Sequence, residues 1–196
     1  MNADIHFKKK YPKRDIVLST ATQLFIQENY ISVGVDRIIA EADIAKATFY
    51  KHFPSKEELV FYCLKQLKLD IQMAVEEHIS KLTTPLEKLE QLYLWYIDWV
   101  NQNGVRGCPF HKAGMEVGNL YPSIQVALDE YWNWLFNLTT SILKEMEIKD
   151  PIALTRLVLS LLDGIINSSV CEQGPIEPEK TWEFIQTLIE LEKNKK

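Results

Sequence analysis

Several features that define other classes of protein are missing from this sequence. It has no apolar run near the roughly 18 residues needed to cross a membrane, and its polar, basic start is unlike a signal peptide. It also lacks a phosphate-binding loop, a metal-ligand spacing and a convincing catalytic triad. We therefore expect a cytoplasmic protein that contacts no membrane, is not an enzyme, and needs neither a metal nor a cofactor.

Cysteine and glycine are scarce as well. The three cysteines (Cys63, Cys108 and Cys171) are odd in number and far apart, which predicts neither a disulfide framework nor a zinc site. Only 7 of the 196 residues are glycine while 46% are hydrophobic, a composition typical of neither fibrous nor disordered chains. The sequence therefore predicts a folded protein with a core of its own.

The net charge of −5 is unevenly divided along the chain. Residues 1–70 contain 11 Lys or Arg and 9 Asp or Glu, whereas residues 71–196 contain 11 and 18. A local excess of basic residues is typical of the part of a protein that binds nucleic acid. We expect the acidic remainder to lie away from DNA.

Residues 35–42 and 46–53 have the pattern of two short helices joined by a tight turn at Asp43. Apolar residues recur at helical spacing in the first segment. In the second segment Phe49 and Phe53 share one face, and the other face carries cations and hydroxyl groups. This pattern predicts a helix-turn-helix whose second helix enters the major groove of DNA.

The second helix and the residues after it read Phe49-Tyr50-x-His52-Phe53-x-Ser55-Lys56-Glu57-x-Leu59. This motif resembles the DNA-binding domain of TetR-family (tetracycline-repressor-like) transcriptional regulators. Apolar residues upstream extend the resemblance over roughly residues 13–60; they are Ile16, Ala21, Leu24, Phe25, Tyr30, Val35 and Ile38. The chain departs from the family at Asp43, where the usual residue is glycine, and at Ala45, where it is serine.

The resemblance implies an all-α protein with an N-terminal three-helix DNA-binding domain and a C-terminal helical ligand-binding and dimerisation domain. We predict that residues 1–55 form the N-terminal arm and the helix-turn-helix domain, and that residues 56–196 form the effector-binding and dimerisation domain. In the family, the residues matching Tyr50, His52 and Lys56 typically touch the DNA backbone; for His52 the alternative is a packing role. The candidate DNA-binding residues are Lys46, Ala47, Thr48, Tyr50, His52, Lys56 and Arg37.

Aromatic residues gather in the helices expected over residues 85–103 and 122–147 and in the segment between them. Most of these side chains must pack in a core, and the resemblance implies that some line a cavity for an apolar or aromatic effector. Such cavities are mostly apolar with few polar groups. The candidate pocket residues are Tyr93, Tyr96, Trp99, Phe110, His111, Met115, Tyr131 and Trp132.

Cys108 precedes Pro109, a residue suited to the first position of a helix, which places the thiol at the helix N-cap. The helix dipole and the nearby Arg106, His111 and Lys112 favour the thiolate, so we expect a lowered pKa and a possible redox sensor. Some TetR-type regulators that resemble this segment sense oxidants or electrophiles there. The alternative is a packing residue, and a catalytic Cys108–His111 pair lacks an oxyanion hole and an orienting acid.

Residues 151–171 form an expected helix with apolar residues on two faces, one of which needs a partner outside its own core. A second copy of the chain is the simplest partner, and in the family the last two long helices form the dimer interface. The candidate interface residues are Leu157, Ser160, Leu161, Gly164, Ile165, Ser168, Trp182, Ile185 and Ile189.

These features predict a homodimeric transcriptional regulator, usually a repressor in this family, that leaves a palindromic double-stranded DNA operator when a small-molecule effector binds. One alternative keeps the DNA-binding role but places the signal in oxidation or alkylation of Cys108. The alternatives from other classes are a helical adaptor that binds no DNA and a cysteine-dependent hydrolase.

Overall fold

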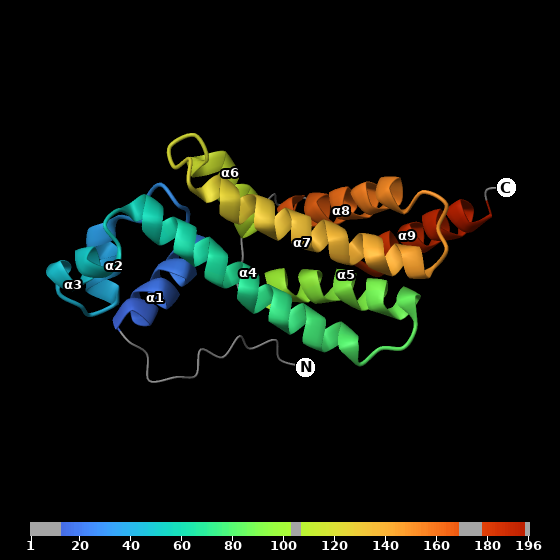
Figure 1. Cartoon of the computed structure of the whole chain (residues 1–196), viewed down its shortest axis with the longest axis horizontal. Helices are drawn as coiled ribbons and strands as arrows, with labels where there is room; N and C mark the ends of the chain where they lie inside the picture. Colours follow the sequence, from blue (N-terminus) through green and yellow to red (C-terminus); the bar gives the residue numbers. More distant parts are fainter. Residues whose placement is uncertain (1–12, 103–106, 169–177, 195–196) are drawn as a thin grey trace.

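The computed structural model describes residues 13–102, 107–168 and 178–194, which form nine helices and no strand. In chain order the helices are α1 (Lys13–Gln27), α2 (Val35–Glu41), α3 (Lys46–His52), α4 (Lys56–Ser80), α5 (Pro85–Gln102), α6 (Pro109–Val117), α7 (Ile124–Glu145), α8 (Pro151–Ser168) and α9 (Pro178–Lys193). Helices α1, α2 and α3 form a head at one end of the molecule, and α5 to α9 form a body along α4 (Figure 1). The all-α expectation is confirmed.

Two apolar helix faces close the head into a small core. Phe49 of α3 and Phe53, the residue that caps the end of α3, are fully buried, and Leu24 and Phe25 of α1 belong to the same buried cluster. The turn between α2 and α3 bends at Asp43, whose φ of 49° lies in the left-handed region. A glycine adopts this conformation without strain. This explains why the family pattern usually has glycine at the position of Asp43.

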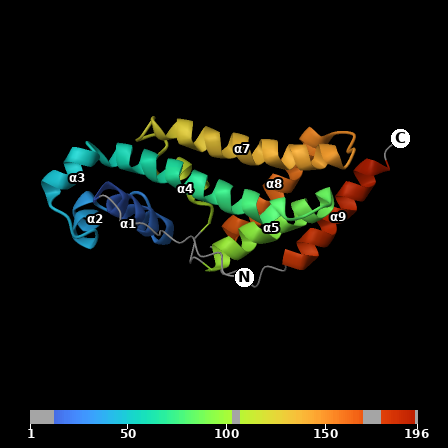
Figure 2. The ribbon, with the colours of Figure 1, turned by 60° about the horizontal axis from the view of Figure 1, so that its bottom comes forward.

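Helix α4 connects the head to the body as one continuous rod (Figure 2). Its first turn is capped by Ser55, whose hydroxyl oxygen accepts a hydrogen bond from the Glu58 N–H at 3.1 Å, as a serine N-cap does. Buried side chains then recur along one side of the helix, from Leu59 in the head to Val75 in the body. The helix is therefore a continuous physical connection between the head and the body.

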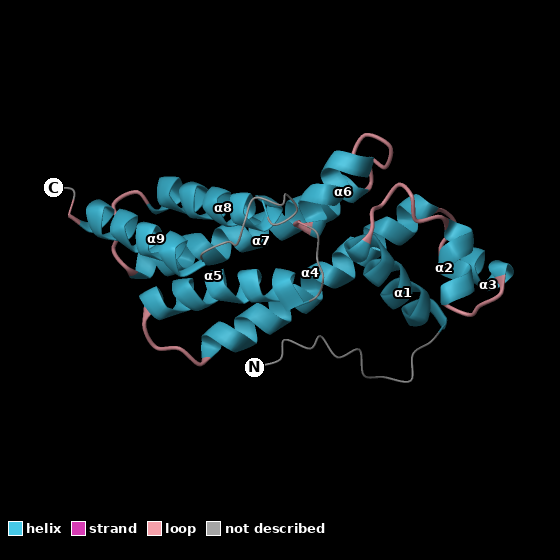
Figure 3. Cartoon of the chain, turned by 180° about the vertical axis from the view of Figure 1, so that it is seen from behind, coloured by secondary structure: helices cyan, strands magenta, loops and turns pink. Residues whose placement is uncertain are grey.

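The body is a layered bundle in which α7 packs against α4, α5 and α8, and α9 packs against α5 (Figure 3). No helix within the described ranges is both long enough and apolar enough to pass through a bilayer. Helix α7 starts at Ile124 and not at the expected Pro122, because the Ile124 N–H donates to the Tyr121 carbonyl at 3.1 Å in a preceding turn. The expected N-terminal arm (residues 1–12), Arg106 and Cys171 lie outside the described residues.

Candidate DNA-binding face and effector groove

The outer face of α3 is the candidate DNA-binding face. Lys46, Ala47 and Tyr50 are exposed, with 45% of Tyr50 accessible, while Thr48 and His52 are half-buried at the edge of the same face. The aromatic rings of Phe49 and Phe53 anchor the opposite face in the head. The helix therefore presents a short polar surface on a rigid support, at the end of the molecule away from α9 (Figure 1).

The cations near this face are not all available to phosphate. Lys46 Nζ lies 2.8 Å from Asp36 Oδ1, in an ion pair whose two side chains are both exposed. Arg37 bridges Glu28 at 2.6 Å and Glu41 at 2.8 Å, and these hydrogen bonds raise the pKa of its guanidinium. Arg37 thus joins the residue that follows α1 to α2, and its predicted DNA contact stays a prediction.

Lys56 also has a partner inside the protein. Its ammonium donates to the Ile31 carbonyl at 3.0 Å and lies 6.0 Å from the centroid of the Phe25 ring. Burial lowers the pKa of Lys56, against the opposing effect of the nearby Glu116 carboxylate. Lys56 therefore ties the connection between α1 and α2 to α4, and its predicted contact with the DNA backbone stays a prediction.

Lys51 was absent from the predicted set although it belongs to the same helix. It is exposed in the last turn of α3, and within the described ranges it takes part in no ion pair. Its position next to Tyr50 was visible in the sequence, but the family motif draws attention to Tyr50 and His52 instead. Lys51 is the better candidate for a phosphate contact than Lys56.

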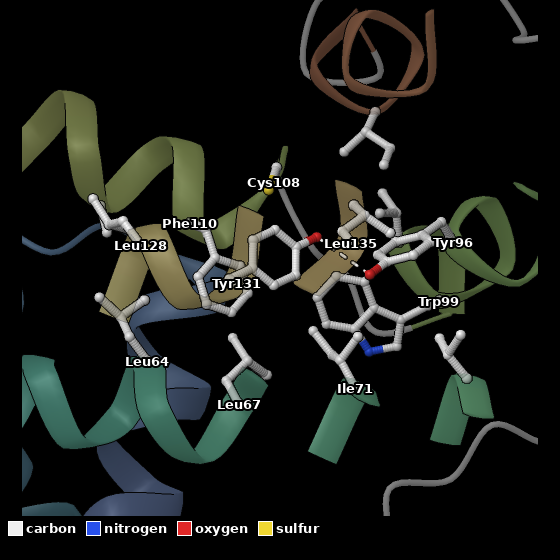
Figure 4. Packing of buried hydrophobic residues seen from close by; sticks show 14 of the residues in the cluster. Leu64, Leu67, Ile71, Tyr96, Trp99, Cys108, Phe110, Leu128, Tyr131 and Leu135 are labelled. Atoms are coloured by element: carbon white, nitrogen blue, oxygen red, sulfur yellow. Dashed lines mark hydrogen bonds between the residues drawn. The ribbon is translucent and has the colours of Figure 1, made fainter. Parts of the chain in front are cut away.

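The predicted aromatic pocket separates into two parts in the structure. Tyr93, Tyr96, Trp99 and Tyr131 are buried at 3% exposure or less and belong to the core. Figure 4 shows the Tyr131 ring stacked on Phe110, with ring centroids 3.7 Å apart, and the Tyr131 hydroxyl donating to Tyr96 Oη at 3.4 Å. These four aromatic residues therefore pack in the core and do not belong to the lining of the groove between α6, α7 and α8.

The other predicted residues line a groove of about 410 Å³ between α6, α7 and α8. Its walls combine aromatic and aliphatic side chains with a few polar groups, and a single acidic residue belongs to the lining. The lining residues are Phe110, His111, Gly114, Met115, Gln125, Leu128, Trp132, Leu159, Ser160 and Asp163. Phe110, His111, Met115 and Trp132 were predicted; the contribution of α8 was missed because it arises from tertiary packing alone.

Cys108 occupies the predicted N-cap of α6, but its surroundings are the reverse of those expected. The residue is 5% exposed, and the Tyr131 hydroxyl lies against it (Figure 4). Burial raises the pKa of the thiol to about 11, although the backbone N–H of His111 works in the opposite direction. The expected low pKa was wrong because α7 covers the thiol and desolvation outweighs the helix dipole.

Helix α6 contacts the groove on one side and the head on the other. Glu116 Oε2 accepts a hydrogen bond from the Tyr30 N–H at 2.6 Å, and the Tyr30 hydroxyl donates to the Pro109 carbonyl at 3.2 Å. Lys112 donates to the carbonyls of Phe25, Ile26 and Glu28 at the end of α1. These contacts, which we call the α6–head clamp, join residues 79 to 87 positions apart.

The outer faces of α8 and α9 carry apolar side chains that no other helix of the described chain covers. Leu157 is 42% exposed, and Phe184 and Leu191 are 62% and 57% exposed. Ser160 and Gly164 are exposed on the same side of α8, and Leu161 and Ile165 are half-buried there; the side chain of Ser168 lies outside the described set.

The predicted contribution of α9 to this face needs a correction. Trp182, Ile185 and Ile189 are at most 4% exposed and pack inside their own chain, where the Trp182 ring lies 5.7 Å from that of Tyr93. The outward side of α9 instead carries Phe184 and Leu191. Both sides of the helix are apolar, so the sequence pattern did not identify which one faces the core.

Comparison with known proteins finds similarity to regulators of one family. Residues 17–63 match the family model described as bacterial regulatory proteins, tetR family. The chain is 27% identical over 113 residues to the Transposon Tn10 TetC protein of Escherichia coli, which covers 58% of this chain and 55% of that protein. It is 25% identical over 167 residues to the Fatty acid metabolism regulator protein of Bacillus subtilis (strain 168); the match covers 83% of this chain and 84% of that protein.

A solved structure extends the similarity beyond the head. The crystal structure of SCO4454, a TetR-family transcriptional regulator from Streptomyces coelicolor, superposes with a TM-score of 0.77 at 28% identity, covering 91% of this chain and 92% of that one. Several curated relatives are matched over only about half of their own length. The family-model match thus lies in the head and the start of α4, and the structural similarity extends through the body.

Proposed function

Because the chain belongs to the TetR family of transcriptional regulators, we propose that it is a dimeric repressor that leaves a palindromic DNA operator when a small effector binds its body. Members of the family are regulators and not enzymes, in agreement with the sequence-based expectation. The observation that carries the proposal is the outer face of α3, with Tyr50 and Lys51 exposed above a buried aromatic anchor. We place this activity in the cytoplasm, where operator DNA is found.

The proposed dimer forms through the outer faces of α8 and α9. A second copy would cover Leu157, Phe184 and Leu191, whose exposure would otherwise leave apolar surface in water. Two α3 helices in such a dimer would enter successive major grooves about 34 Å apart. The operator would then be a palindrome with half-sites about one helical turn apart.

The proposed release depends on the two sides of α6. An effector in the groove contacts His111 and Gly114 on one side of the helix, while Lys112 and Glu116 hold the head on the other. If the effector binds one orientation of α6 more tightly, it shifts the dimer toward heads whose spacing does not match DNA. The free energy that couples effector binding to DNA release is then the difference in effector affinity between the DNA-binding state and the released state.

The alternative signal, modification of Cys108, has less physical support. A thiol that is 5% exposed with a pKa raised to about 11 reacts slowly, because the thiolate is the nucleophile. Reversible capture of a ligand by the groove requires no such chemistry. We therefore favour the ligand-released mechanism over the redox mechanism.

The test is selection from a random duplex pool by the purified, reduced full-length protein. The proposal predicts recovery of a palindrome that two copies of the chain occupy together. A helical adaptor that binds only protein would enrich no sequence and would show no salt-dependent DNA affinity. That result would overturn the proposed function.

A further inference from the structure

The groove between α6, α7 and α8 is lined by residues that favour a ligand of a particular charge as well as a particular shape. Its volume of about 410 Å³ is that of a small-molecule site. The rings of Phe110 and Trp132 line it, and Leu128 and Leu159 add aliphatic surface. An occupant therefore needs an apolar or aromatic body.

Asp163 is the one carboxylate in the lining, and lysine and arginine are absent from the described residues that form it. Its side chain is 25% exposed; Oδ2 lies 3.1 Å from His111 Nδ1, and Oδ1 accepts from Asn167 Nδ2 at 2.9 Å. Asn167 Oδ1 in turn accepts from the Cys108 N–H at 3.2 Å. The carboxylate is thus held at the groove by two residues, His111 and Asn167, neither of which carries a permanent positive charge.

A carboxylate beside aromatic rings is complementary to a cation that has an apolar body. The ring faces attract a cation through their quadrupole, and the attraction grows as water is excluded. An anionic ligand would meet Asp163 with no lysine or arginine among the described lining residues to offset the repulsion. The surrounding half of the chain is acidic too, with 11 Lys or Arg against 18 Asp or Glu over residues 71–196.

We propose that the effector is a monovalent organic cation with an aromatic or bulky apolar body, bound in this groove with its charge beside Asp163 and its apolar body against Trp132. The inference deepens the proposed function and rests on it for the consequence of binding, release of DNA. The α6–head clamp supplies that link, because Lys112 and Glu116 lie on the same helix as His111.

The probes are tetraphenylphosphonium and tetraphenylborate, which have the same shape and opposite charge. Calorimetric titration of each ion into the full-length protein, without DNA, in a potassium-free buffer of moderate sodium chloride concentration measures binding directly. We expect the phosphonium ion to bind and the borate ion not to bind. Equal binding of the two ions would show that hydrophobicity alone controls the groove and would overturn the inference.

Three variants locate the site. Asp163→Asn keeps the size and hydrogen-bonding capacity of the side chain but removes its charge, and should weaken phosphonium binding at least about tenfold, or about 1.4 kcal/mol. Trp132→Leu should weaken it several-fold through the lost ring face. Asp98→Asn removes the same charge from an exposed position on α5 outside the groove and should change affinity less than about twofold.

The final arm measures affinity for the selected operator with and without the phosphonium ion. We expect the ion to weaken operator binding by the wild-type protein and not by Asp163→Asn, with both proteins showing equal helical content. Phosphonium binding that survives Asp163→Asn, or that leaves operator affinity unchanged, would contradict the inference. Failure to select any operator would instead refute the proposed function, while the titrations without DNA would stand.

Discussion

Replacing Glu116 by alanine should weaken the junction between head and body by about 1–3 kcal/mol, the cost of leaving a buried donor without its partner. The Tyr30 N–H donates to Glu116 Oε2 at 2.6 Å, and Tyr30 is 2% exposed, so water has little access to the freed group. Glu116→Gln keeps an acceptor oxygen at the same place. Its cost should therefore be smaller, about 1 kcal/mol, the loss of charge assistance.

The assay combines chemical denaturation with hydrogen exchange of the peptide that contains Tyr30. In the wild-type protein we expect the Tyr30 amide to be protected, in Glu116→Gln slightly less so, and in Glu116→Ala to exchange much faster. The matched control is Glu145→Ala, which removes a half-exposed carboxylate that lies 3.1 Å from Lys88 within the body. An ion pair of that kind contributes at most about 1 kcal/mol.

The ranking of the two substitutions is the decisive result. If Glu116→Ala and Glu116→Gln lose equal stability and leave exchange at Tyr30 unchanged, this hydrogen bond does not hold the head in solution. The proposed coupling through α6 would then lose its best-defined contact. A loss confined to Glu116→Ala, with faster exchange at Tyr30, would support it.

Four further results are expected. Alkylation of Cys108 in the folded protein, followed by peptide mass mapping, should be on the order of a hundredfold slower at neutral pH than alkylation of a free thiol with its usual pKa near 8.5. The reaction should become faster as the pH rises toward 11. A fast reaction at pH 7 would restore the redox mechanism. Lys51→Met should reduce the salt slope of operator binding by about one unit, and an unchanged slope would remove Lys51 from the phosphate-binding set. Gly164→Leu should leave the monomer folded, because a Cβ there meets nothing within 4 Å, and should abolish the dimer in analytical ultracentrifugation; a stable dimer would place the interface elsewhere. Glu147→Gly should raise the free energy of unfolding by roughly 0.5–1 kcal/mol, since Glu147 has a φ of 59° after α7, and a loss of stability would show that this conformation carries no strain.

Local patterns predicted most of the helices and the helix-turn-helix. The spacing of Phe49 and Phe53, the proline after them and the serine cap at Ser55 act over a few residues, so the sequence alone reports them. The turn at Asp43 was also predicted, and its left-handed φ explains the residue usually found there.

The groove and the clamp depend on packing between distant segments, which the sequence pattern did not reveal. Asp163 joins His111 only because α8 packs next to α6, and Glu116 meets Tyr30 across 86 positions of the chain. Cys108 was predicted to be reactive from neighbours along the chain, whereas its pKa is set by burial under α7.

The central claim, that α3 reads operator DNA, is tested most directly by comparing two affinities over a range of salt concentrations. One duplex is the selected palindrome, and the other is a scrambled duplex of the same composition. We predict that the palindrome is bound on the order of a thousandfold more tightly at physiological salt, and that both affinities fall steeply as salt rises. Equal affinity for the two duplexes would contradict the claim, because phosphate attraction alone does not distinguish sequences.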